Sequence, residues 1–227
     1  MKKKIIDSLK DPFNNKENVI NLMIGGIITF FPVLNLISLG YLGKKLKKSI
    51  QQDRSGVKWD ENLKELFITG LFLFVIWLSY LILPFLLMFL GGSLMLSLSG
   101  GKILSLFYFR GQILNLIGTI TLLIALYFLP FAVCIYLEDG DIKTAFNLQK
   151  VLEKIFLVVK EYTISYLIII GLLTASIAII FLFMNWIMGF LLSGFIFFYD
   201  GLVITGILGK IFPRKAITIS LLEISEG

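Results

Sequence analysis

The sequence predicts an all-α protein, a polytopic bundle of transmembrane helices that forms a single integral membrane domain over 1–227. Apolar residues make up 57% of the chain and charged residues 16%, whereas a soluble domain carries about 25% charged residues. A water-soluble fold of this length has too small an interior to hide so much Leu, Ile and Phe. Several uncharged stretches also exceed the roughly 20 residues that a helix needs to cross a bilayer.

The N-terminal part combines a basic segment, 1–18, with an apolar membrane segment, 19–43. The apolar segment contains Pro32, and a proline in mid-helix removes a backbone hydrogen bond. Two interpretations stay open: a kinked helix that crosses the bilayer, or a re-entrant hairpin that turns near Pro32 and leaves on the side it entered. The hairpin keeps all of the 21 Lys and Arg residues except Lys102 and Arg110 on the cytoplasmic side, as the positive-inside rule prefers.

Four further apolar segments predict full transmembrane helices. Asp200 is the one charged residue within them. They span 66–90, 113–137, 163–184 and 187–209. The same order of four elements occurs twice, over 58–137 and 139–209: a polar cytoplasmic segment, a membrane helix, an outer connection and a second membrane helix. This order suggests a parallel internal repeat.

The segment 141–162 predicts an amphipathic helix on the cytoplasmic side. Its apolar residues recur at helical spacing, and polar residues fall on the opposite side: Lys143, Asn147, Lys150, Lys154 and Glu161. The apolar stripe either lies along the membrane interface or packs on neighbouring helices. With this helix and the basic segments inside, the sequence predicts a multi-pass protein of the cell membrane whose C-terminus is cytoplasmic.

Short motifs along nearly the whole chain resemble one protein family. In the first half they are Leu39-Gly40-Tyr41-Leu42, Trp59-Asp60, Glu65-Leu66-Phe67, Gly70-Leu71, Tyr80 and Pro84. In the second half they are Glu138-Asp139-Gly140, Ala145-Phe146-Asn147 and Lys150-Val151-Leu152. These motifs resemble the DUF4013 family of archaeal and bacterial membrane proteins, although the family has a Leu-Pro where this chain has Val57-Lys58. The resemblance implies a multi-pass membrane protein without an assigned activity, and it transfers no catalytic residues.

Asp200 is the main candidate for a functional position, because it lies near the middle of a predicted transmembrane helix. A carboxylate at that depth must be protonated, paired or directed into a polar cavity. It could form a proton or cation site, it could pair structurally between helices, or the helix could break at Gly201 and leave it near water. Candidate partners in an intramembrane polar site are Asn185, Asn115 and Arg110. Each of them could equally form an ordinary interhelical hydrogen bond.

Two further groups of residues suggest contacts. A basic cluster is a candidate for binding anionic lipid headgroups at the cytoplasmic face, where each cation contributes about 1 kcal/mol, or it serves topology alone: Lys44, Lys45, Lys47 and Lys48. Small residues recur every four positions beside Asp200, which permits close helix packing within the chain or between two copies: Gly201, Thr205 and Gly209.

The residue types present argue against catalysis. The chain has no histidine and a single cysteine, so His-based metal and Ser–His sites and internal disulfides are excluded. No cofactor or metal is expected. No nucleic-acid partner is expected either, because membrane topology accounts for the net charge of +6. We expect a non-enzymatic subunit or scaffold of a membrane assembly, with membrane lipids and other membrane proteins or further copies of itself as partners. The alternative is a small transporter or channel for an ion or small solute that uses Asp200.

Overall fold

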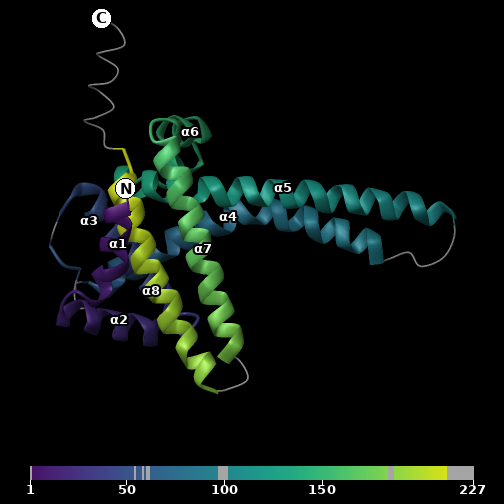
Figure 1. The fold of residues 1–227 in the computed structure, drawn as a ribbon. Coiled ribbons are helices and arrows are strands. Elements are labelled where there is room, and N and C mark those ends of the chain that lie inside the picture. Colours follow the sequence, from purple (N-terminus) through teal and green to yellow (C-terminus); the bar gives the residue numbers. More distant parts are fainter. Residues whose placement is uncertain are drawn as a thin grey trace, which may run out of the picture. The chain divides into compact units, whose positions relative to one another are not determined.

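The computed structural model describes residues 2–53, 55–57, 59, 62–96, 102–183 and 187–213. Over these ranges all regular structure is helical, which confirms the all-α prediction (Figure 1). Within the described part of the chain, four helices are long and apolar enough to cross a membrane, as the sequence predicts. The chain divides into two compact units. Unit 1 comprises residues 1–74 and 131–227, and unit 2 comprises residues 75–130.

Unit 1 begins with short helices whose ends are set by local side chains. Helix α1 (Lys2–Lys10) leads into a 3-10 turn, η1 (Asp11–Phe13), and then α2 (Lys16–Thr29). The Asn15 side chain accepts a hydrogen bond of 2.7 Å from the Asn18 backbone N–H, which satisfies one of the unpaired donors at the start of α2.

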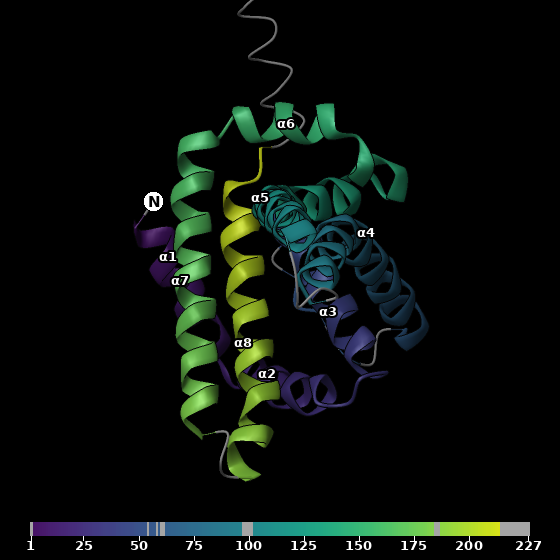
Figure 2. The same cartoon turned by 90° about the vertical axis from the view of Figure 1, so that its right-hand side faces the viewer.

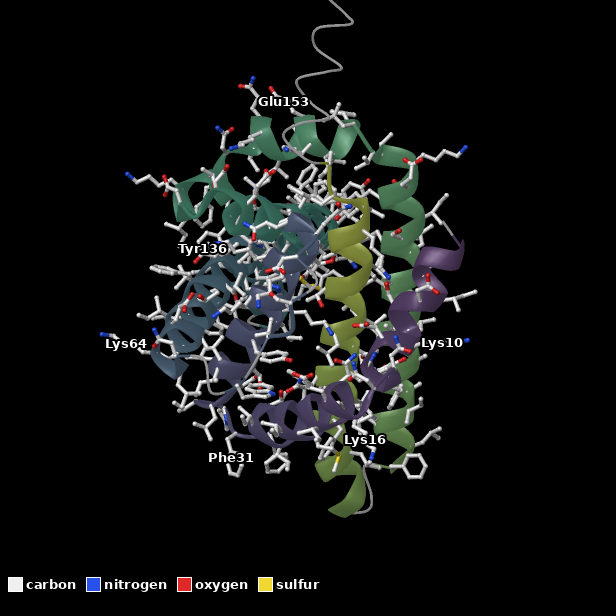
Figure 3. All side chains as sticks on the ribbon, turned by 90° about the vertical axis from the view of Figure 1, so that its left-hand side faces the viewer. Lys10, Lys16, Phe31, Lys64, Tyr136 and Glu153 are labelled. Carbon is white, nitrogen blue, oxygen red and sulfur yellow. The ribbon has the colours of Figure 1, made fainter. Side chains whose placement is uncertain are left out.

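The segment 19–43 forms a helical hairpin instead of one kinked helix. Helix α2 ends at Thr29, a turn contains Pro32, and α3 (Asn35–Gln51) leads back. Lys45 Nζ lies 2.9 Å from Asp11 Oδ2, so the residues before α2 meet the second half of α3. Had the segment continued straight as one helix, these ends would be more than about 30 Å apart. Figure 3 shows Phe31 in the hairpin turn at the opposite end of unit 1 from Glu153.

Helix α8 (Ile187–Ile211) is the centre of unit 1 and contacts α1, η1, α2, α3 and α7. Helix α7 (Val159–Phe183) runs beside it (Figure 2). Apolar side chains on several sides of α8 are at most 3% exposed: Phe198, Leu202, Val203, Ile207 and Leu208. Burial on several sides of one helix explains why its sequence shows no clear polar face.

The predicted amphipathic helix over 141–162 is divided in the structure. The segment forms η2 (Ile142–Phe146), α6 (Leu148–Phe156) and the first turn of α7. Asn147 separates η2 from α6, and its side chain accepts a hydrogen bond of 3.1 Å from the Lys150 backbone N–H. This cap starts a new helix instead of continuing the old one. Figure 2 shows α6 lying across the ends of α7 and α8.

Unit 2 consists of the C-terminal part of α4 (Leu63–Leu96) and the N-terminal part of α5 (Lys102–Asp139). Glycines allow the two helices to approach closely: a Cβ on Gly91 would lie 2.8 Å from the Gly111 carbonyl oxygen. The Asn115 amide donates to Met95 Sδ at 3.2 Å across the same contact. Both helices extend beyond the predicted segments 66–90 and 113–137.

Candidate functional site

A polar cavity of about 400 Å³ lies within unit 1. Its lining comes from three separate parts of the chain: 8–21, 41–57 and the end of α8. It contains amides, hydroxyls and both signs of charge, among them Asn14, Asn18, Asn21, Glu17, Lys48 and Lys210. Ligand sites in proteins are typically concave and carry a few converging polar groups, so this cavity is the candidate functional site.

Helix α3 supplies two lysines to the cavity, and both contact neighbouring segments. Lys45 forms the ion pair with Asp11 that joins α3 to η1. Lys48 Nζ donates a hydrogen bond of 2.7 Å to the Gly56 carbonyl oxygen, which holds residues 55–57 at the cavity. An ammonium group has three N–H donors, so each lysine retains donors for a ligand.

Asp53 and Ser55, which also line the cavity, bond to each other. Asp53 accepts hydrogen bonds of 2.8 Å from the Ser55 backbone N–H and 2.7 Å from its hydroxyl. These two bonds from Ser55 hold the pKa of Asp53 below its usual value. Asp53 is therefore charged at neutral pH and already bonded, and it has less capacity for a ligand than a carboxylate without partners.

Aromatic side chains support the cavity wall formed by Tyr41. Its hydroxyl donates to the Val57 carbonyl oxygen at 3.2 Å, and its ring stacks on Trp59 with centroids 4.1 Å apart. Phe198 of α8 packs on both rings and fills the space beside Gly25, where a Cβ would lie 2.1 Å from it. Tyr41 and Trp59 both belong to the motifs that resemble the family. Their stacking is a structural reason for the presence of both residues.

The end of α8 closes the cavity on the side of α1. Lys210 Nζ donates a hydrogen bond of 2.8 Å to Ser8 Oγ, and the Tyr199 hydroxyl donates to the Leu9 carbonyl oxygen at 3.1 Å. Gly206 lets α1 lie close, since a Cβ there would be 3.1 Å from Ser8 Oγ. These contacts join α1 to α8, although the bonded residues are 190 and 202 positions apart in the chain.

The predicted basic cluster is divided between different surroundings. Lys45 and Lys48 line the cavity, whereas Lys44 lies 3.5 Å from Glu65 Oε2 and Lys47 is exposed. The sequence prediction missed the asparagines of the cavity, although they left a signal. Asn14, Asn18 and Asn21 recur at helical spacing at the start of an apolar segment, a pattern typical of one polar face.

Asp200 faces α7 and is not among the residues that line the cavity. Its side chain is 1% exposed, and neither carboxyl oxygen has a hydrogen-bond partner among the described residues. The buried Ser176 hydroxyl of α7 is close enough to interact with it. Of its predicted partners, Asn115 and Arg110 belong to unit 2, and Asn185 lies outside the described residues. The intramembrane polar site stays a prediction.

The predicted small-residue stripe on α8 lies against α3. A Cβ on Gly201 would be 2.5 Å from Leu42 Cδ1, and one on Gly209 would be 2.0 Å from Ser49 Oγ. The Thr205 hydroxyl between them donates back to the Leu202 carbonyl oxygen at 2.8 Å. Because this bond lies within α8, the hydroxyl is satisfied without a polar partner on α3. Small residues here permit the close approach of α3 and α8.

Comparison with known proteins identifies a family but no characterised relative. No curated protein and no solved structure matches the chain. A family model described as "Protein of unknown function (DUF4013)" matches residues 23–189. The match runs from α2 to the first turn of α8, so Asp200 and Lys210 lie beyond it. Because the matched residues make up more than half of the sequence, the chain belongs to the DUF4013 family.

Proposed function

We propose that this multi-pass membrane protein is a non-enzymatic subunit or scaffold of a membrane assembly. The observation that carries the proposal is the outer surface of unit 2. Its two helices contact each other through Gly91, Gly111 and Gly118, and their bulky apolar side chains point outward. Those at least 60% exposed include Ile82, Phe89, Leu116 and Leu123. Bulky side chains of this kind can interdigitate with those of another membrane helix, and van der Waals packing is one of the forces that drive helix association where lipid is equally apolar.

The polar groups of unit 1 support a structural role. Charged side chains of α6 contact those at the end of α5: Lys150 forms an ion pair with Asp139, and Lys154 contacts Glu138. These ion pairs join the end of α5 to α6, so the charges stabilise the fold. Lys160 at the start of α7 and Lys210 in the last turn of α8 favour a cytoplasmic position for this end of the pair.

Site-specific photo-crosslinking in native membranes tests the proposed scaffold role. A photoreactive amino acid at Phe89 or at Leu123 is expected to yield discrete adducts with other membrane proteins. The matched control is Ile177 on α7, which is 58% exposed but belongs to unit 1, and which is expected to yield lipid adducts. If Phe89 and Leu123 also yield lipid alone, and the extracted protein migrates as a single chain, the scaffold proposal is wrong.

A small transporter is the second candidate function, and Asp200 is the observation that favours it. A carboxyl group that is 1% exposed, without a hydrogen-bond partner among the described residues, could take up a proton or cation between α7 and α8. Reconstitution in liposomes tests this candidate. Transport predicts a proton or cation flux that Asp200→Asn abolishes and Thr205→Ser preserves, and equal flux in wild type and Asp200→Asn would eliminate it.

A further inference from the structure

We propose that the polar cavity of unit 1 binds a zwitterionic phosphate-ester headgroup, that is, a phosphate joined to an ammonium group. This inference goes beyond the scaffold role, which requires no ligand. The cavity is assembled from α1, η1, α2, α3, residues 53 and 55–57 and the end of α8. Interfaces between membrane helices usually close through small or apolar residues. A polar space of about 400 Å³ is instead large enough for a small ligand.

The charge of the lining selects the class of ligand. Three lysines face the cavity, Lys45, Lys48 and Lys210, and so do three carboxylates, Asp11, Glu17 and Asp53. Among the described residues of the lining, the charges are therefore balanced. A simple anion would leave the carboxylates opposed to it, and a simple cation would leave the lysines opposed to it. A ligand that carries one charge of each sign can match both.

The contacts within the cavity indicate which groups receive each charge. Asp11 is paired with Lys45, and Asp53 is bonded to Ser55. Glu17 is the carboxylate of the lining for which no such bond is found among the described residues. A Cβ on Gly56 would lie 3.5 Å from Glu17 Oε1, so Glu17 approaches the residue whose carbonyl oxygen accepts from Lys48. Glu17 is the acceptor for the ammonium group.

Lys48 is the donor for the phosphate group. It donates one N–H to the Gly56 carbonyl oxygen and has two others. The amides of Asn14 and Asn21 add neutral donors to the same lining. Lys210 lies in the last turn of α8, a membrane-spanning helix, so the cavity is near the membrane boundary. The headgroup can therefore come from a lipid or from a soluble phosphate ester.

Native mass spectrometry of the purified full-length protein tests the proposal with two lipids of identical acyl chains. Phosphatidylethanolamine carries both charges, and phosphatidylglycerol carries the phosphate alone. The wild type is expected to bind the first about tenfold more tightly, which corresponds to one charge-assisted hydrogen bond. Equal binding of the two lipids, or a preference for phosphatidylglycerol, overturns the proposal. Competition with glycerophosphoethanolamine identifies the source of the headgroup. Full displacement of phosphatidylethanolamine indicates a soluble ester as the natural ligand, and weak displacement indicates a lipid. Both outcomes require a site for a zwitterionic phosphate ester.

Two variants and a matched control locate the binding to the cavity. Glu17→Gln changes an exposed side chain and is expected to remove the preference for phosphatidylethanolamine while leaving the melting temperature unchanged. Lys48→Gln is expected to weaken binding of both lipids about tenfold. Lys47→Gln removes the same charge from the same helix at an exposed position outside the cavity, and it should bind as the wild type does. If Lys47→Gln weakens binding as much as Lys48→Gln, lipid binds by surface charge and the proposal fails.

Discussion

Replacing Lys154 by Met would remove a buried cation that joins α6 to the end of α5 and to the residues directly after α8. Lys154 is 7% exposed. Its Nζ donates a hydrogen bond of 3.0 Å to the Pro213 carbonyl oxygen, lies 3.4 Å from Glu138 Oε2 and lies 5.1 Å from the centroid of the Phe212 ring. The long methionine side chain keeps most of the packing volume. The change therefore removes the charge and its contacts without creating a large cavity.

The expected cost follows from the burial of the partner. The Glu138 side chain is 12% exposed, and without Lys154 its charge would remain in a poorly solvated position. Loss of one member of a buried ion pair costs about 3–5 kcal/mol. Because both partners keep some exposure, we expect a loss of about 3 kcal/mol in the free energy of unfolding. The double variant Lys154→Met with Glu138→Gln should recover part of this loss, since no unpaired charge remains.

Unfolding of the purified protein in mixed detergent micelles measures this loss, with Lys143→Met as control. Lys143 lies in η2, directly before α6, and its side chain is exposed. Removing an exposed charge leaves no buried carboxylate unpaired, so we expect a change within about 0.5 kcal/mol. If Lys154→Met costs no more than Lys143→Met, burial of the pair is not what makes Lys154 important, and the reasoning is refuted.

Two further predictions concern the packing of α3. A Cβ on Gly70 would lie 1.7 Å from the Leu36 carbonyl oxygen, so Gly70→Ala is expected to cost about 3 kcal/mol through overpacking. The control is Gly171→Ala, which has no atom within 4 Å of the new Cβ and should be neutral or stabilise by up to about 1 kcal/mol. Equal effects of Gly70→Ala and Gly171→Ala would contradict the close contact between Gly70 and Leu36. Tyr41→Phe removes the bond to the Val57 carbonyl oxygen and should lower the free energy of unfolding by about 1 kcal/mol in the same assay; an unchanged stability would mean that this bond contributes nothing.

The transmembrane helices could be predicted because their cause is local. Backbone amides in hydrocarbon must bond within their own segment, so a long apolar run is enough to predict a helix. The ends of the helices depend on other features. Helix α4 begins at Leu63, three residues before the predicted segment, where Asn62 Oδ1 accepts a hydrogen bond of 3.4 Å from the Glu65 backbone N–H. Caps of this kind, and not apolarity, set where α4 begins.

Periodicity was a weaker guide to the charged residues. It assigned Lys154 to the polar side of one amphipathic helix, whereas the structure buries this side chain. A lysine can be buried when an anion and a carbonyl oxygen compensate its charge. Those groups come from Glu138 and Pro213, and Pro213 is far along the chain. Spacing within one helix carries no information about partners on other helices.

The sequence by itself determined that this protein resides in a membrane and which segments form its long helices, because burial of apolar side chains and bonding of the backbone are decided within each segment. Only the tertiary structure decided which polar groups meet. Lys210 reaches Ser8, and Lys45 reaches Asp11, because α1, η1 and α3 all pack around α8. Hydrogen bonds and ion pairs act over a few ångströms in space. Their partners are therefore chosen by the packing of the helices and not by their order in the chain.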